Sequence, residues 1–179
     1  MAQQLQLPFD PAGRCYLAAP FFNEAQVDLV AHIEEAFFEE QCEFFSPRLH
    51  AGVIQPGDPD KVLDSVFEAN MAGMREATWM LAVQPYLLPE GHSLHLCSQY
   101  TPVSRVEQPD TGTVWEMGAA FTLKLPTVAF VYPPGVEGVT VNLMLLRSVY
   151  GTVSTIDNLR HLLNGSSTAL GAWHPEESQ

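Results

Sequence analysis

The sequence has 179 residues, of which 46% are hydrophobic and 16% are charged, so it can form one domain with a sizeable core and is not a disordered chain. Its formal net charge of −13 would repel a phosphate backbone, which argues against a nucleic acid polymer as a partner. A small neutral ligand is compatible with this charge, which mainly favours solubility.

The three cysteines, Cys15, Cys42 and Cys97, are widely spaced and form no C-x-x-C pair, as is typical of core thiols in a reducing compartment. The amino terminus lacks a basic region followed by a long apolar run, and no segment reaches the roughly 18 apolar residues that span a bilayer. We therefore expect a cytoplasmic protein that does not enter a membrane.

The amino-terminal part of the chain predicts a strand, a helix and a second strand. The apolar run Arg14–Ala19 ends at a proline, as expected of a buried first strand. Asn23 and Gln26 form a capping-box pattern for a helix whose apolar face continues to about Glu40. Residues 43–46 are a candidate second strand.

The next helix is predicted to begin at Asp58, with Pro59 in its first turn, and to run to about Ala77. Its expected inward-facing residues are Val62, Val66, Ala69, Gly73 and Met74. The segment Trp79–Val83 is apolar throughout, which predicts a central strand of a parallel sheet that is buried on both faces.

Residues 86–109 are long for a connection, and such a segment is usually functional or contains a small hairpin. Leu94–Cys97 and Tyr100–Val103 are the candidate strands of that hairpin. His92 and His95 lie three residues apart, but no third ligand is spaced to complete a metal site, so we expect no metal there.

The stretch Asp110–Gly118 places two carboxylates, two hydroxyls and two glycines within nine residues. It predicts a helix with Thr113 as N-cap and Glu116 in the first turn, where the helix dipole favours an ionised carboxylate at a strand-to-helix turn. The same residues fit a capping box with an Asx turn at Asp110, so a structural and a functional interpretation both stay open. The expected inward-facing residues are Val114, Met117, Ala120 and Phe121.

The carboxyl-terminal part predicts a fourth buried strand at Thr127–Tyr132 and a short apolar segment at Val141–Leu146, whose polar residue is Asn142. A last helix starts at Thr155 and ends at Asn164, which a glycine follows. Its expected inward-facing residues are Leu159, Leu162 and Leu163.

Strands that alternate with helices predict an α/β fold with a parallel sheet between layers of helices, in a single domain over residues 14–165. Residues 1–13 form a lead, and residues 86–109 form an insertion. The tail, residues 166–179, has no periodicity and is expected to be mobile unless Trp173 docks it.

Four motifs resemble the nucleoside 2-deoxyribosyltransferases, in order, over most of residues 14–163. They are Tyr16-Leu-Ala-Ala-Pro-Phe-Phe22, Phe67-Glu-Ala-Asn70, Asp110-x-Gly-Thr-x-x-Glu-Met-Gly118 and Val141-Asn-Leu-Met144. The third motif is the most specific. The resemblance implies a flavodoxin-like fold and an enzyme of nucleotide salvage that exchanges the base of a 2′-deoxyribonucleoside for a free nucleobase, through a covalent deoxyribosyl-enzyme and without a cofactor.

The resemblance also implies roles for single residues. Glu116 would be the nucleophile, Tyr16 would orient it, and Asp110 would bind the base and help to protonate the leaving nitrogen. Asn142 would reach the sugar of a neighbouring subunit's site, which implies a homo-oligomer, either a dimer or a hexamer. Further substrate contacts are expected from Phe21, Phe22, Asn70, Gly112, Thr113, Met117 and Met144.

Two features depart from the family pattern. Better-known members carry an aspartate at the position of Asn70, and an asparagine cannot donate a proton as an acid, so the base preference stays open. The insertion at residues 86–109 is also longer than the family core needs, and it would serve as a lid or as an oligomer contact.

Two other functions stay open. A hydrolase of 2′-deoxynucleosides or their 5′-monophosphates would use the same nucleophile with water as acceptor, although the loop Ala18–Phe22 has neither a glycine nor a basic residue to hold a phosphate. A nucleoside-binding protein without catalysis is the second alternative, and the joint presence of Glu116, Asp110 and Tyr16 argues against it.

Overall fold

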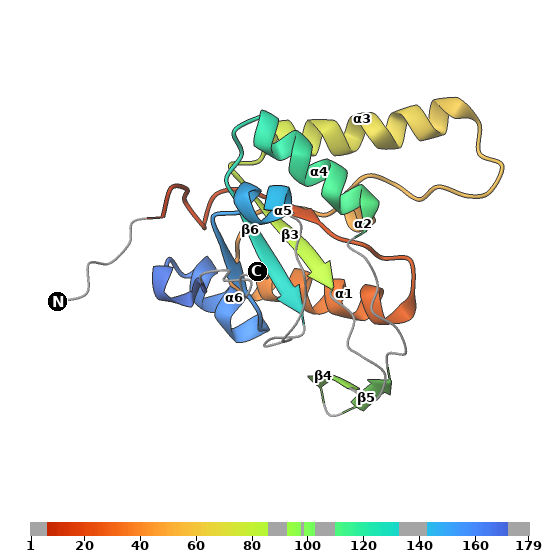
Figure 1. Ribbon diagram of the computed structural model, residues 1–179. Helices are drawn as coiled ribbons and strands as arrows, with labels where there is room; N and C mark the ends of the chain where they lie inside the picture. Colours follow the sequence, from red (N-terminus) through yellow and green to blue (C-terminus); the bar gives the residue numbers. More distant parts are fainter. Residues whose placement is uncertain (1–6, 86–92, 98, 103–109, 133–142, 172–179) are drawn as a thin grey trace.

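The computed structural model describes residues 7–85, 93–97, 99–102, 110–132 and 143–171. Five strands form one parallel sheet in the order β2-β1-β3-β6-β7 (Figure 1). Counted along the chain within this sheet, the order is 2-1-3-4-5, which is the flavodoxin-like arrangement. The strands are β1 (Cys15–Ala18), β2 (Phe44–Phe45), β3 (Trp79–Pro85), β6 (Thr127–Tyr132) and β7 (Gly151–Val153).

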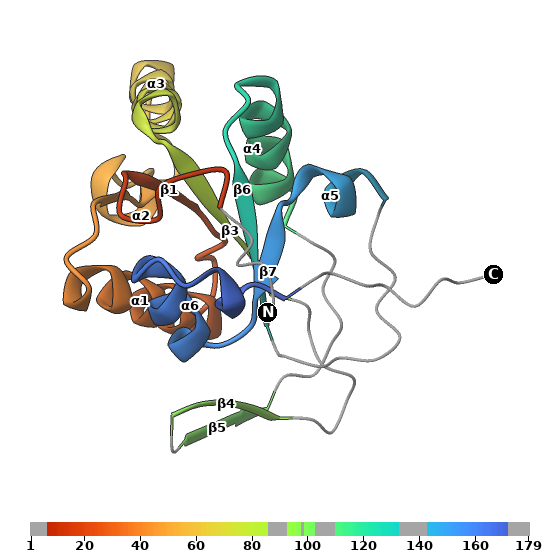
Figure 2. The same ribbon diagram turned by 90° about the vertical axis from the view of Figure 1, so that its left-hand side faces the viewer.

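Helices cover both faces of the sheet. Helices α1 and α6 pack on one face, and α3, α4 and α5 pack on the other (Figure 2). The helices are α1 (Glu24–Glu39), α2 (Pro47–His50), α3 (Asp60–Glu76), α4 (Thr111–Thr122), α5 (Leu143–Ser148), α6 (Ile156–Leu163) and the 3-10 turn η1 (Ser167–Ala169). In the part of the chain that the structure describes, each helix is too short or too polar to cross a bilayer.

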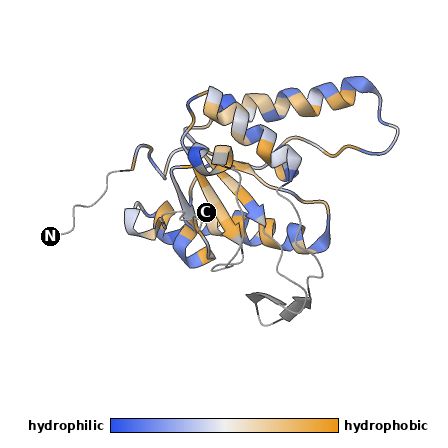
Figure 3. Ribbon diagram, viewed as in Figure 1, coloured by the Kyte–Doolittle hydropathy of each residue, from blue (hydrophilic) through white to orange (hydrophobic). Residues whose placement is uncertain are grey.

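Each face of the sheet has its own apolar core. Leu17, Leu81 and Phe130 point toward α1 and α6, whereas Tyr16 and Met80 point toward α3 and α4. Alternate residues of each central strand are therefore buried on opposite faces, which is why these strands are almost continuously apolar (Figure 3). This confirms the prediction of an α/β fold with a central parallel sheet.

Several predicted boundaries are confirmed. Strands β1, β3 and β6 occupy the three long apolar runs, and α1 begins after Asn23, whose side chain accepts from the Gln26 N–H. The predicted hairpin is present as the antiparallel strands β4 (Ser93–Cys97) and β5 (Gln99–Pro102). Helix α6 ends before Gly165, whose φ of 82° lets the chain turn back on the last helical carbonyls.

The predicted start of α3 is wrong. The helix begins at Asp60 with Pro59 as its N-cap, because the Asp58 carboxylate accepts from the Gln55 N–H at 2.6 Å and closes a turn before the helix. Only the carboxyl-terminal end of α3 packs on the sheet, so just Gly73 and Met74 are buried among the residues expected to face inward. Val62, Val66 and Ala69 remain partly exposed.

Four short elements were not predicted from the sequence, namely α2, α5, β7 and the 3-10 turn η1. The apolar segment predicted at residues 141–146 becomes the helix α5 from Leu143 onward. The first part of the tail is also ordered, since Thr152 of β7 pairs with Gly171 and Leu170 packs against the core. Trp173 lies outside the described residues.

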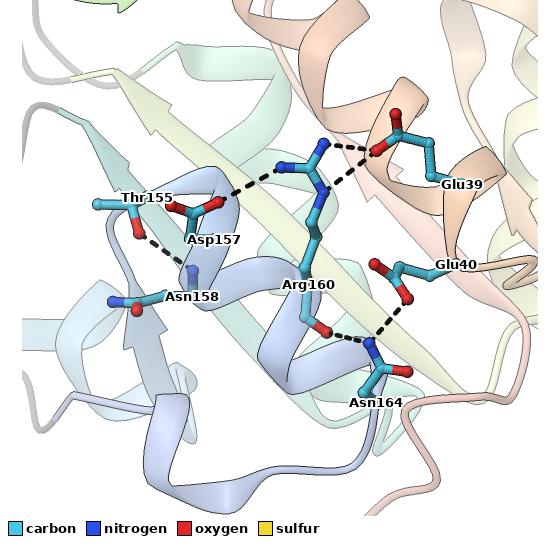
Figure 4. Close-up of polar contacts among 7 residues, drawn as sticks. All are labelled: Glu39, Glu40, Thr155, Asp157, Asn158, Arg160 and Asn164. Atoms are coloured by element: carbon cyan, nitrogen blue, oxygen red, sulfur yellow. Dashed lines mark hydrogen bonds and ion pairs between the residues drawn. The ribbon is translucent and has the colours of Figure 1, made fainter.

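Polar side chains join the ends of α1 and α6 (Figure 4). Arg160 donates to Glu39 and to Asp157, and Asn164 donates to Glu40 at 2.7 Å. This network lies at the surface, so the apolar contacts beneath it are expected to contribute more to stability.

Candidate active site

The sheet order places a topological switch point between β1 and β3, because the connections that follow these strands run toward opposite edges of the sheet. In open α/β sheets, ligands bind at the carboxyl ends of the strands at such a point. Helix α4 contacts both strands, so its side chains are within reach of this edge.

Tyr16 and Glu116, which are 100 residues apart in the chain, meet beside the switch point. The Tyr16 hydroxyl donates to Glu116 Oε1 at 2.6 Å. Tyr16 is fully buried in β1, and Glu116 projects from α4. A short bond from a rigid strand residue holds the carboxylate in one orientation.

The prediction that Thr113 caps the helix is wrong. Asp110 is the N-cap of α4, and its Oδ2 accepts from the Thr113 N–H at 2.7 Å and from the Thr113 hydroxyl at 3.0 Å. The helix therefore begins at Thr111, and Glu116 lies in the second turn, beyond the unpaired N–H groups. Met117 and Ala120 face the core as predicted, but Phe121 is 65% exposed.

The environment of Glu116 favours its protonated form. Burial and, to a smaller extent, the charge of Asp110 raise the pKa of Glu116, the hydrogen bond from Tyr16 lowers it, and the net pKa is about 7. This contradicts the expectation that the helix dipole would favour the ionised carboxylate, because that effect fades within the first turn. Glu116 can therefore hold or release a proton near neutral pH.

Tyr16 stays protonated beside this carboxyl group. Burial raises the pKa of Tyr16, and the neighbouring Glu116 raises it further. The phenol is therefore a permanent hydrogen-bond donor to Glu116. Such a pair can support nucleophilic or general acid–base chemistry at one carboxylate oxygen.

The two phenylalanines after β1 form part of the same edge. The rings of Phe21 and Phe22 stack with their centroids 5.7 Å apart. They line a hollow of about 420 Å³ together with Asn23, Glu24, Val27 and Asp28. Because Phe22 is 76% exposed, it is not a core residue, and its ring is accessible to a flat ligand.

The other candidate residues lie on several elements. Asn70 is on α3, where its buried Oδ1 has no hydrogen-bond partner among the described residues. Thr113 is buried in the first turn of α4, next to the exposed Gly112. Met144 is 74% exposed on α5, and Asn142 lies outside the described residues.

Two residues beside the site were not identified from the sequence. Gln84 is buried at the carboxyl end of β3, and its Nε2 donates to Met117 Sδ at 3.1 Å. The sequence feature that could have identified Gln84 is its position as a polar residue at the end of an apolar strand. Phe45 of β2 stacks on the Tyr16 ring. Nothing in the sequence distinguishes Phe45 from other apolar residues. Among the described residues, no three metal-ligating side chains lie close enough together to hold an ion.

Comparison with known structures supports the fold. A 2-deoxyribosyltransferase from Bacillus psychrosaccharolyticus aligns with a TM-score of 0.62 and 24% identity, over 82% of this chain and 90% of the other. A conserved protein from Enterococcus faecalis V583 aligns with a TM-score of 0.61 and 15% identity, over 86% of this chain and 98% of the other. No curated protein sequence matches this chain.

The family model described as nucleoside 2-deoxyribosyltransferase matches residues 15–144, a span that includes β1, α3 and the whole of α4. The match contains the Tyr16 and Glu116 pair and its Asp110 neighbour. This chain therefore belongs to the nucleoside 2-deoxyribosyltransferase family.

Proposed function

We propose that this protein transfers the 2-deoxyribosyl group between nucleobases, with Glu116 as the nucleophile. The observation that carries the proposal is the carboxylate of Glu116, partly buried, held by the Tyr16 hydroxyl at 2.6 Å, and placed beside the switch point of the sheet. Its pKa of about 7 provides the ionised form at neutral pH.

In the first half-reaction, a Glu116 oxygen attacks C1′ of the deoxyribose while the bond from C1′ to the base nitrogen breaks. The electron pair of that bond stays on the base, which takes up a proton as it leaves, and a deoxyribosyl ester of Glu116 remains. In the second half-reaction, a nitrogen of another base attacks C1′, loses its proton and releases the carboxylate. Two displacements retain the configuration at C1′.

Burial of Glu116 favours the ester. The surroundings that raise its pKa disfavour the negative charge, and formation of the ester removes that charge. Tyr16 can then stabilise the carboxylate again when the ester is broken.

The base would lie against the phenylalanine rings in the loop that follows β1. Phe21 and Phe22 offer a stacked aromatic wall, and Asn70 offers an amide for the base edge. Asp110 stands close enough to raise the pKa of Glu116, and we assign it the proton transfer to the leaving nitrogen. Gly112 and Met144, which are exposed, would line the remaining substrate surface, and the buried Thr113 and Met117 would support it from beneath.

We also propose that the protein is a homo-oligomer whose neighbouring subunit contributes Asn142 to the sugar site. Large apolar side chains are exposed on the face formed by α3, α4 and α5, and a partner subunit would cover them. They are Leu63, Phe67, Trp115, Phe121 and Met144.

The experiment is a base-exchange assay with deoxyinosine or thymidine, in the presence and absence of adenine, followed by chromatography. Formation of deoxyadenosine only with adenine is expected, and Glu116→Ala should abolish it while leaving the circular dichroism spectrum unchanged. Release of free base at the same rate without adenine would instead identify a hydrolase. Exchange at the wild-type rate in Glu116→Ala would disprove the covalent mechanism.

A further inference from the structure

The Tyr16 ring has an aromatic neighbour that the proposed chemistry does not use. Phe45 of β2 is the register partner of Tyr16 in β1, so the two side chains leave the sheet on the same face. Their rings are nearly parallel, with centroids 5.6 Å apart and an interplanar angle of 10°. Phe45 is therefore in direct contact with the residue that holds Glu116.

Helix α3 packs closely on the Phe45 ring because it has a glycine, Gly73, at the point of contact. A Cβ atom at Gly73 would lie 2.6 to 2.7 Å from Cγ, Cδ1 and Cδ2 of the Phe45 ring, so the absence of a side chain lets the helix backbone approach the ring this closely. Phe45 thus packs against the Tyr16 ring and against the backbone of α3, with little room to move.

The position of the tyrosine ring decides where its hydroxyl lies. The hydroxyl is at the far end of the ring from the backbone, so a small tilt of the ring displaces it and lengthens the 2.6 Å bond to Glu116. The Phe45 contact limits that tilt from one side.

We propose that Phe45 is a positioning residue, which stacks on Tyr16 and, with Gly73 behind it, keeps the tyrosine hydroxyl on the Glu116 carboxylate. This inference rests on the proposed role of Glu116 in the transfer reaction. It assigns a role in the reaction to Phe45, which lies in β2 at the edge of the sheet.

The chain contains a matched control. Phe44 precedes Phe45 in β2, is 9% exposed where Phe45 is 8% exposed, and packs on the opposite face of the sheet against Phe37. The variants Phe45→Leu and Phe44→Leu remove the same atoms from similarly buried sites, and only the first touches Tyr16.

The experiment measures kcat and KM for exchange between deoxyinosine and adenine in both variants, each made in the wild type and in Tyr16→Phe. We expect Phe45→Leu to lower kcat about tenfold with KM within about twofold, and Phe44→Leu to leave kcat within about twofold. In the Tyr16→Phe background, Phe45→Leu should change kcat less than about twofold, because the hydroxyl it positions is absent. An equal loss of kcat in both backgrounds, or an equal loss in Phe44→Leu, would refute the proposal.

A second readout does not depend on turnover. The pKa of the Glu116 carboxyl group can be followed by carbon-13 NMR of glutamate-labelled protein, and because the Tyr16 bond lowers this pKa, Phe45→Leu and Tyr16→Phe should both raise it. If the wild type exchanges no base, the proposed function fails, yet this titration still tests the positioning role. If Phe45→Leu does not fold, Gly73→Ala displaces the same ring and should raise the pKa in the same way, and an unchanged pKa would refute the role.

Discussion

At the scale of single residues, Glu116 links activity to stability. Its pKa is about 7 in the folded protein and 4.5 in the absence of structure. Between these two pH values the folded state keeps a proton that the unfolded chain has lost, so stability decreases as the pH rises. The loss begins near pH 4.5, is complete above about pH 7, and amounts to on the order of 3 kcal/mol.

Replacement of this carboxyl group by a neutral amide should therefore stabilise the protein and abolish its activity. Glu116→Gln is expected to raise the melting temperature above pH 7 and to leave it nearly unchanged below pH 4.5, where both proteins are neutral at this position. Thermal unfolding of both proteins across this pH range checks the prediction. Equal melting temperatures at every pH would show that Glu116 ionises at its ordinary value.

At the scale of elements, Asp110 caps the amino terminus of α4 and also raises the pKa of Glu116, and substitutions can separate these two effects. Asn caps a helix as well as Asp does, so Asp110→Asn should keep the stability of the protein, whereas Asp110→Ala should cost about 1 kcal/mol. Because the Asp110 charge raises the pKa of Glu116, both variants should shift the acidic limb of the kcat/KM profile to lower pH. Chemical denaturation and pH profiles of the two variants measure these effects, and an unshifted limb in both would show that the Asp110 charge does not act on Glu116.

Helix α6 packs on α1 through both polar and apolar contacts, and we expect the apolar contacts to contribute more to the free energy of unfolding. Arg160 donates to Glu39 at the surface, so Arg160→Ala should cost less than about 1 kcal/mol, and less still at high salt. Leu162 is fully buried two residues later, and Leu162→Ala should cost about 2 to 5 kcal/mol at any salt concentration. Urea denaturation at low and high salt measures the loss of unfolding free energy in each variant. A larger loss in Arg160→Ala than in Leu162→Ala would contradict the prediction.

At the scale of the whole molecule, the exposed apolar face of α3, α4 and α5 predicts self-association. Phe121 on α4 and Phe38 on α1 are almost equally exposed, at 65% and 63%, but lie on opposite sides of the sheet. We expect Phe121→Glu to dissociate the oligomer and Phe38→Glu to leave it intact, because only the first places a charge in the proposed interface. Light scattering coupled to size-exclusion chromatography distinguishes these outcomes, and a monomeric wild type would contradict the proposed assembly.

The long central strands were predictable because β1, β3 and β6 are buried on both faces, which makes them apolar runs bounded by turn residues. The start of α4 was not predictable, because Asp110 and Thr113 are both good N-caps and the local sequence does not distinguish between them. Strand β7 has three residues, which is too short for a periodic pattern.

The sequence by itself determined the α/β class, the positions of the long central strands along the chain, and the motif that contains Glu116, because these depend on hydrophobic patterns and on residues that are neighbours in the chain. The family resemblance implied that Tyr16 orients Glu116, but only the tertiary structure decided that a 2.6 Å hydrogen bond joins them, that Phe45 stacks on Tyr16, and that the pKa of Glu116 rises. The physical reason is that burial and hydrogen bonding depend on partners far apart in the sequence, which come together only when the sheet and its helices assemble.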